Sequence, residues 1–400
     1  MTTEQLVALQ NPDLAAMSAA QIASIAVGKI TALETQQIVA LTSAQVAGMT
    51  TAQIAALETH QIAAIETLDI RALTSAQVAA LTTEQAQALT AAQVAALETA
   101  DLRALSTSAF GTFSSEQLAA LTTAQTAGLT TGQLRALSTE QITQLDNADV
   151  AALTTAQLIT LTTDQVAALT SDQIVAMTGA QVASLTTAQV FNLTTTQIAA
   201  LETNYLRSLT TLQASVLTSE QIESLSSTQF AALETVDLRA VAPASLAGLS
   251  TSHMGAMTSA QLAAMTTTQV AALSTTQIAA IPTANLAALN TAQIKALPDA
   301  SVTALTSDQI VALNTLQFAT LSTDQIRALG TEQIAAIETA DIKALTAQQV
   351  GALDSVQAPA LKASQIAAID ALDIKSLTTD ALIVLDSSQI AALTAAQAAA

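Results

Sequence analysis

The sequence predicts an all-α fold, a solenoid or superhelix of about fifty very short helices with one helix in each eight-residue repeat. Written in eights from Met1, the 400 residues form fifty octads whose register never slips. Octad position one is apolar in all fifty, position five is Gln in thirty-five, and position six is Ile, Leu, Val, Met or Phe in forty-five. We therefore expect a single tandem-repeat domain over residues 1–400.

Each octad carries a signal for starting a helix. In units such as LTSAQVAG (41–48) and MTTAQIAA (49–56), positions two and five form the pattern Thr-x-x-Gln. This is a capping box, in which the hydroxyl accepts a hydrogen bond from an early backbone N–H while Gln reaches back to the cap. Positions six and nine then lie on one helical face, so that Ile and Leu point together into a shared core.

The placement of charged residues supports short helices independently. Thirty of the 31 acidic residues fall at octad positions two to five, and nine of the 11 basic residues fall at position seven. Acids at the start of a helix and bases near its end interact favourably with the helix dipole, by about 0.3–1 kcal/mol each. A strand would give no reason for this segregation.

Two other conformations compete with this prediction. In one continuous helix, eight residues overshoot two turns by about 80°, so the apolar stripe would spiral and leave no stable buried face. A compact β-solenoid is the remaining alternative. It would place positions one and six on opposite faces and would depend on Ala and Gln, which are poor strand formers.

Short helices must support one another, because isolated helices below about 12 residues are marginal in water. Stability then becomes a sum of octad and nearest-neighbour contributions along the array. We expect a weak helix in octad 353–360, where Pro359 lies at position seven. A longer period of 136 residues relates LETADLRA (97–104) to LETVDLRA (233–240), through either a duplicated block or a recurring superhelical environment.

Composition limits the possible partners. A net charge of −20 with only 11 basic residues excludes nucleic acid, because phosphate binding needs Lys and Arg. No cysteine is present, which excludes disulfides and thiolate metal sites. Thr, Ser and Gln interrupt every apolar run, so we expect no membrane insertion. The start, MTTEQLVALQNPDLAA, lacks the basic and apolar regions of a secretory signal.

The sequence predicts no catalytic, cofactor-binding or metal site, and therefore no enzyme and no small-molecule substrate. His60 and His253, 193 residues apart at positions four and five, are predicted to be solvated surface residues. The many Ser and Thr hydroxyls lack the nearby base that would activate a nucleophile. Asp occurs mostly once per octad, so calcium sites could arise only across stacked repeats. Phe110 and Phe113 are expected to fill the core, with a kink in the array as the alternative.

Arrays of Leu-Thr-Thr-x-Gln-Ile/Val-Ala-Ala resemble the Thr/Ala/Gln-rich repeat tracts of very large bacterial exported or surface proteins, which are often described as adhesin-like. The resemblance covers the whole chain and rests on these octapeptide units. It implies an extracellular or cell-surface location, with the cytoplasm as the alternative.

The leading functional hypothesis is a passive structural role: a spacer, an adhesin stalk or a self-assembling filament. Fifty equivalent octads with no unique site motivate it. The expected partners are further copies of the chain, another protein or a surface. A solenoid module that binds proteins or peptides is the alternative. Recognition of ice or a polymer lattice is a smaller one, which requires Thr hydroxyls that the capping box would otherwise occupy.

Overall fold

The computed structural model describes residues 1–399, and it is entirely helical. Every octad forms one helical element, and each α-helix has four to six residues. Three octads form 3-10 helices instead. Residues 1–399 contain no strand. The predicted all-α solenoid of short helices is confirmed, and the β-solenoid alternative is wrong.

Contacts within the chain group it into two compact units, Met1–Leu201 (unit 1) and Glu202–Ala400 (unit 2). The prediction of one continuous domain stays a prediction. The helices of unit 1 are α1 (Thr3–Val7), α2 (Asn11–Ala15), α3 (Ala19–Ala23), α4 (Val27–Ile30), α5 (Thr35–Val39), α6 (Ser43–Gly48), α7 (Thr51–Ala56), α8 (Thr59–Ala64), α9 (Thr67–Ile70), α10 (Ser75–Ala79), α11 (Thr83–Ala88), α12 (Ala91–Ala96), α13 (Thr99–Ala104), α14 (Thr107–Phe110), α15 (Ser115–Ala119), α16 (Thr123–Gly128), α17 (Thr131–Ala136), α18 (Thr139–Ile142), α19 (Asn147–Ala152), α20 (Thr155–Leu158), α21 (Thr163–Ala168), α22 (Ser171–Ala176), α23 (Gly179–Ser184), α24 (Thr187–Phe191) and α25 (Thr195–Ala200).

The helices of unit 2 are α26 (Thr203–Leu206), α27 (Thr211–Ala214), α28 (Ser219–Ser224), α29 (Ser227–Ala231), α30 (Thr235–Ala240), η1 (Pro243–Gly248), α31 (Thr251–Ala256), α32 (Ser259–Ala264), α33 (Thr267–Ala272), α34 (Thr275–Ala279), α35 (Thr283–Leu286), α36 (Thr291–Ala296), α37 (Asp299–Thr303), α38 (Ser307–Ala312), α39 (Thr315–Thr320), α40 (Thr323–Ala328), α41 (Thr331–Ala336), α42 (Thr339–Lys343), α43 (Ala347–Val350), η2 (Ala358–Ala360), α44 (Ala363–Ala368), η3 (Ile374–Ser376), α45 (Thr379–Leu382), α46 (Ser387–Ala391) and α47 (Ala395–Ala399).

Octad 49–56 shows how one repeat folds. The Thr50 hydroxyl accepts a hydrogen bond from the Gln53 backbone N–H at 3.1 Å, and the Thr50 N–H donates to Gln53 Oε1 at 2.8 Å. This is the predicted capping box, and it starts α7. Ile54 is fully buried, and Leu57 at the first position of the next octad is 4% exposed. The two apolar positions therefore supply the core.

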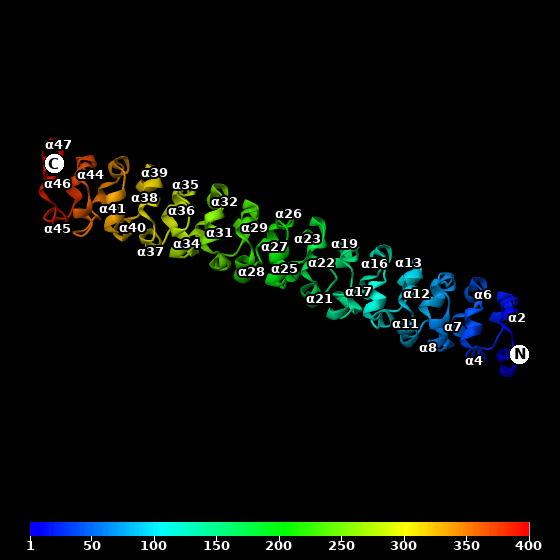
Figure 1. Ribbon diagram of the computed structural model, residues 1–400. Coiled ribbons are helices and arrows are strands. Elements are labelled where there is room, and N and C mark those ends of the chain that lie inside the picture. Colours follow the sequence, from blue (N-terminus) through cyan, green and yellow to red (C-terminus); the bar gives the residue numbers. More distant parts are fainter. Residues whose placement is uncertain (400) are drawn as a thin grey trace. The chain divides into compact units, whose positions relative to one another are not determined.

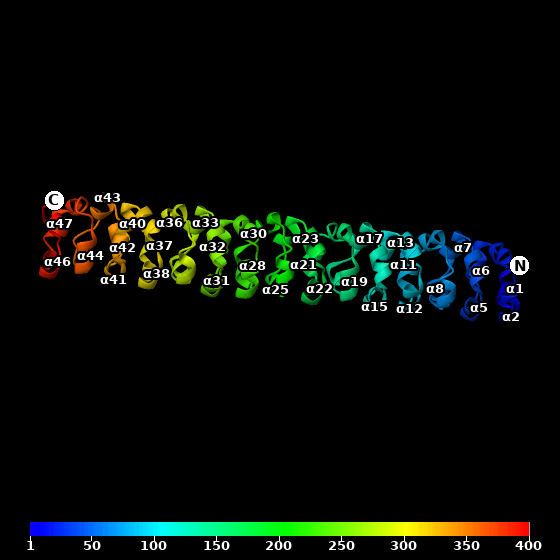
Figure 2. The same cartoon turned by 90° about the horizontal axis from the view of Figure 1, so that it is seen from above.

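The octads wind into a superhelix within each unit. A helix packs against the third helix along the chain, as α10 packs against α13 in unit 1 and α33 against α36 in unit 2. Hydrogen bonds between adjacent turns join residues 25 to 31 positions apart. One superhelical turn therefore takes between three and four octads. In unit 1 the helices follow in chain order from α2 to α23, and unit 2 is ordered in the same way in both views (Figures 1 and 2).

Two local predictions are confirmed. Phe110 and Phe113 are both buried, and their ring centroids lie 4.9 Å apart, so they fill the core. Octad 353–360 forms only the short 3-10 helix η2 around Pro359. Because proline lacks an N–H and clashes with the preceding turn, a regular helix is disfavoured there.

Candidate functional site

The most specific polar feature of the structure is the side chain at octad position five. Most Gln side chains at this position are buried, whereas Gln5 and Gln21 in the first superhelical turn are exposed. Gln53 is completely buried. Its Oε1 serves the capping box, while its Nε2 points to the preceding superhelical turn. There Nε2 donates to the backbone oxygens of Ile22 at 2.9 Å, Ala23 at 3.4 Å and Ile25 at 2.8 Å.

We call these three oxygens the carbonyl cradle: the backbone carbonyls that lie 31, 30 and 28 residues before a position-five residue. The same arrangement recurs at Gln77, Gln181 and Gln293. Gln therefore has two tasks. It caps its own helix, and it donates to backbone oxygens at a helix end in the turn before it. The Ile22 oxygen also accepts from the Ile25 N–H at 3.0 Å, whereas the Ile25 oxygen depends on Gln53.

Other residues at position five also donate to the cradle. Lys29 Nζ donates to the Met1 carbonyl at 2.7 Å, and Asn285 Nδ2 donates to the Met257 carbonyl at 2.7 Å. In both cases the acceptor lies 28 residues earlier. The cradle thus accepts both neutral and cationic donors.

His253 also belongs to this group, so the prediction that it is solvated is wrong. It is 3% exposed, its Nδ1 accepts from the Ser250 N–H at 3.0 Å, and its Nε2 lies 2.6 Å from the Leu225 carbonyl. An imidazole with Nε2 protonated and Nδ1 free satisfies both contacts. His60 at position four is exposed as predicted, with Nδ1 3.3 Å from Glu58 Oε2. The two histidines therefore have unrelated structural roles.

The repeat itself identifies the family. A family model described as the ALTTAQ repeat matches more than half of the chain, at residues 30–64, 62–99, 94–131, 142–179, 230–267, 254–283, 278–315, 310–336 and 334–371. The chain belongs to the ALTTAQ repeat family. No curated protein matches it.

Seven ALTTAQ octads carry an acid at position five, and in each of them the acid is Asp rather than Glu. The Asp side chain is one methylene shorter than that of Gln, and it forms different hydrogen bonds. Asp69 Oδ1 accepts from the Ser43 hydroxyl at 2.6 Å, and Asp101 Oδ1 accepts from the Ser75 hydroxyl at 2.5 Å. The hydroxyl lies 26 residues earlier in both pairs. A carboxylate cannot donate to the carbonyl cradle, so these octads replace the cradle bonds with a different link between turns.

Burial changes the acidity of three of these carboxyls. Desolvation raises the pKa of Asp149, Asp237 and Asp341 above the ordinary value, because the charged form loses water. The negative charges of the acids at position two of the same octads add to this increase. At the surface the pKa shift has the opposite sign. Hydrogen bonds from its own backbone and from Thr82 lower the pKa of Glu84.

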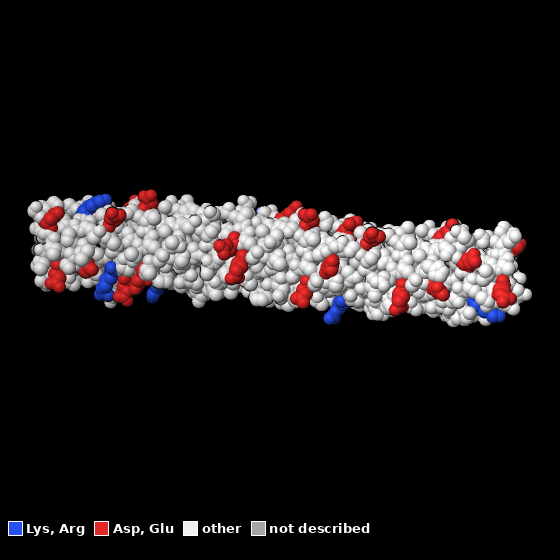
Figure 3. Space-filling model, turned by 60° about the horizontal axis from the view of Figure 1, so that its bottom comes forward, with Lys and Arg blue, Asp and Glu red and all other residues white. Residues whose placement is uncertain are grey.

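On the face drawn in Figure 3, acidic side chains are dispersed singly or in small groups and outnumber Lys and Arg. No group of three or more His, Cys, Asp or Glu side chains within residues 1–399 is placed to hold a metal ion. In the same residues, every helix is too short or too polar to span a bilayer.

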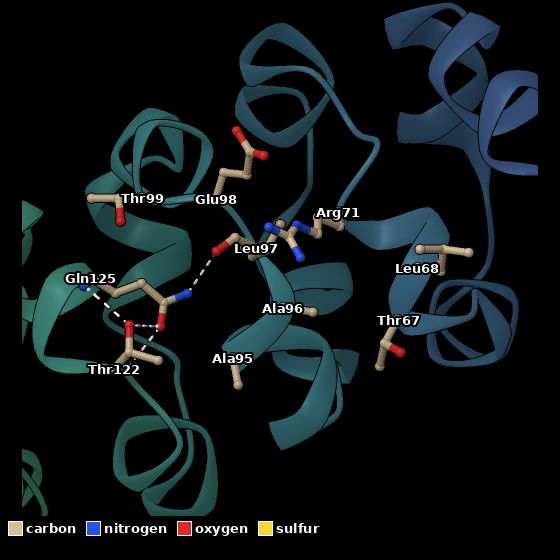
Figure 4. A pocket seen from close by; sticks show the side chains of 10 residues that line it. All are labelled: Thr67, Leu68, Arg71, Ala95, Ala96, Leu97, Glu98, Thr99, Thr122 and Gln125. Carbon is tan, nitrogen blue, oxygen red and sulfur yellow. Dashed lines mark hydrogen bonds between the residues drawn. The ribbon is translucent and has the colours of Figure 1, made fainter.

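A groove of about 620 Å³ runs between ALTTAQ turns of unit 1. Leu68, Arg71 and Glu98 are among the residues that line it (Figure 4). Leu68 occupies position four and is 69% exposed. At the other end of the groove, Gln125 is fixed by Thr122 and by the Leu97 carbonyl, to which its Nε2 donates at 2.8 Å. Thr122, Gln125 and the Leu97 carbonyl therefore serve the repeat's own packing.

Proposed function

We propose that this ALTTAQ repeat chain is a non-enzymatic structural element, a spacer or stalk that separates or displays other modules at a cell surface or outside the cell. One observation carries the proposal. The side chains that could take part in chemistry are the hydroxyls at position two and the amides at position five, and they are hydrogen-bonded to backbone atoms of the repeat. Thr90 and Gln93 show the pattern, with hydrogen bonds to each other and to the previous turn.

The geometry also suits a spacer mechanically. Each turn is tied to the previous one by buried hydrogen bonds and by apolar residues at positions one and six, and the same contacts recur through each unit. Because stability in such an array is built from nearest-neighbour contacts, whole octads can be added or removed without changing the packing elsewhere. The length that the array spans can therefore change in evolution through the number of repeats.

A length series tests the proposal. Deleting residues 73–104, which are four whole octads, should shorten the maximum dimension seen by small-angle scattering while the far-ultraviolet circular dichroism stays helical. A matched deletion of residues 75–102 breaks the register and should unfold the surrounding helices. A globular scattering profile for the full chain, or equal damage from both deletions, would refute the structural role. Protease digestion of intact source cells tests the surface location separately.

The exposed Leu68 in the groove favours a second candidate, a binding module for protein segments. An aliphatic side chain that is 69% exposed beside Arg71 and Glu98 resembles the mixed composition of a weak interaction site. Sedimentation of the chain and of its Leu68→Gln variant tests self-association through this groove. An association constant that is unchanged by the substitution would exclude the groove as a contact between copies.

A further inference from the structure

Two rare residues of the repeat meet in the core of unit 1. Thr126 is the one polar side chain among the fifty residues at octad position six, and it is fully buried. Asp149 is one of seven acids at position five, and it is 2% exposed. The Thr126 hydroxyl is close enough to the Asp149 carboxyl to lower its pKa as a hydrogen-bond donor. Other octads place an apolar side chain at position six.

The Asp149 carboxyl is incompletely satisfied. Its Oδ2 is the one buried side-chain nitrogen or oxygen within residues 1–399 that has no hydrogen-bond partner. The Thr126 hydroxyl is also shared, because its Oγ1 lies 3.3 Å from the Thr122 carbonyl. One hydroxyl proton cannot serve both acceptors at once. A buried carboxylate without compensation is costly, and such groups normally have a water or an ion beside them.

The register of the repeat assigns a carbonyl cradle to residue 149 as well. For residue 149 the cradle consists of the carbonyls of Leu118, Ala119 and Leu121, which lie 31, 30 and 28 residues earlier. In Gln octads this position is filled by Nε2, and at Lys29 a positively charged Nζ donates to a cradle carbonyl at 2.7 Å. Asp149 supplies no such donor. The Leu118 carbonyl keeps the Leu121 N–H as a donor at 3.2 Å, whereas the Ala119 and Leu121 carbonyls receive no side-chain donor from residue 149.

We propose that a hard metal cation, coordinated by oxygen atoms alone, binds between the Asp149 carboxylate, the Thr126 hydroxyl and the carbonyl cradle of Leu118, Ala119 and Leu121. Carboxylate, hydroxyl and backbone carbonyl oxygens are the ligands that Na⁺ and Ca²⁺ class ions take in proteins. The ion replaces the missing Nε2 donor and links two superhelical turns. Asp146 in the same octad adds a second negative charge nearby.

The test compares cation-dependent stability in matched variants of the full chain. Thermal unfolding is followed by circular dichroism in choline chloride, with NaCl or CaCl2 substituted at constant ionic strength. At a concentration about ten times the dissociation constant, the cation should raise the midpoint by roughly 2–3 °C in at least one of the two series. Asp149→Gln restores the common octad residue, should fold, and should abolish the rise. Thr126→Val should reduce it.

Asp341→Gln is the control for the loss of a buried acid at position five. It removes the same charge and restores the same residue, but the core residue at the place that corresponds to Thr126 is Phe318. The cation should raise the unfolding midpoint of this variant as much as that of the unmodified chain. Absence of a rise in the unmodified chain, or equal rises in the unmodified chain and Asp149→Gln, would overturn the proposal. A midpoint that depends on pH but on neither cation would also overturn it, because it would show a protonated carboxyl in place of the ion.

Discussion

The double task of Gln at position five makes Gln93→Glu an informative substitution. Glu is a standard capping-box residue, so its carboxylate can still accept from the Thr90 N–H, which now donates to Gln93 Oε1 at 2.8 Å. The substitution removes the donor that reaches the Ile62 and Ile65 carbonyls at 2.9 and 2.7 Å. It places a second acceptor oxygen against them instead. If Gln served only as a cap, the change would be nearly neutral.

The structure predicts a large loss of stability. The Ile62 carbonyl keeps the Ile65 N–H as a donor at 3.2 Å, so the Ile65 carbonyl is the one of these two that is left without a donor. Leaving one buried carbonyl without a donor costs about 1–3 kcal/mol, which is the expected loss. Burying a charge increases it further. As the pH falls, the new carboxyl takes up a proton and its O–H can donate to one carbonyl, so part of the loss should return in acid. Chemical unfolding and hydrogen exchange of residues 57–96 measure both effects.

Gln5→Glu is the matched control. Within residues 1–399, the Gln5 side chain makes one hydrogen bond, in which Oε1 accepts from the Thr2 N–H, and none to a cradle, while the Gln5 backbone N–H donates to the Thr2 hydroxyl. The control should therefore change stability by less than about 0.5 kcal/mol. A Gln93→Glu variant that is as stable as Gln5→Glu, with unchanged exchange of the α8 and α12 amides, would refute the role of Nε2 in joining the turns.

Two further predictions follow from the same geometry. Burial raises the pKa of Asp341 in the folded chain above its ordinary value of 3.8, which applies to the unfolded chain. The folded state therefore holds the proton more tightly, and the free energy of unfolding falls as the pH rises from the ordinary pKa to the raised one. Asp341→Gln should therefore stabilise the chain more at pH 7 than at pH 3.5 in urea unfolding, and an equal gain at both would contradict the assigned shift. Gly248→Ala would bring a Cβ into a steric clash with the Ser219 carbonyl oxygen and should lower the unfolding midpoint. At Gly255 the added Cβ would have no atom within 4 Å, so Gly255→Ala should instead raise the free energy of unfolding by about 0.5–1 kcal/mol through helix propensity. Similar effects at both glycines would show that the contact between turns at Gly248 does not limit stability.

The helix in each octad could be predicted from the sequence because its causes lie within eight residues. The Thr50 and Gln53 capping box and the apolar pair Ile54 and Leu57 are local, and the structure contains both. The failure of octad 353–360 to form an α-helix was predictable for the same reason, since Pro359 acts on its own turn. Local chemistry therefore determined the element type, the repeat length and the core positions.

The tertiary structure decided what each position-five residue contacts. The partners of Gln53 lie 28 to 31 residues earlier, and no pattern within one octad shows how many octads complete a turn. His253 was predicted to be exposed because position five was expected to hold exposed polar residues, yet the Leu225 carbonyl of the preceding turn accepts from it. The meeting of Asp149 with Thr126 depends on the same winding. Side-chain identity set the chemistry of these groups, and the pitch of the superhelix set their partners, because contacts between turns depend on small rotations that accumulate over several helices.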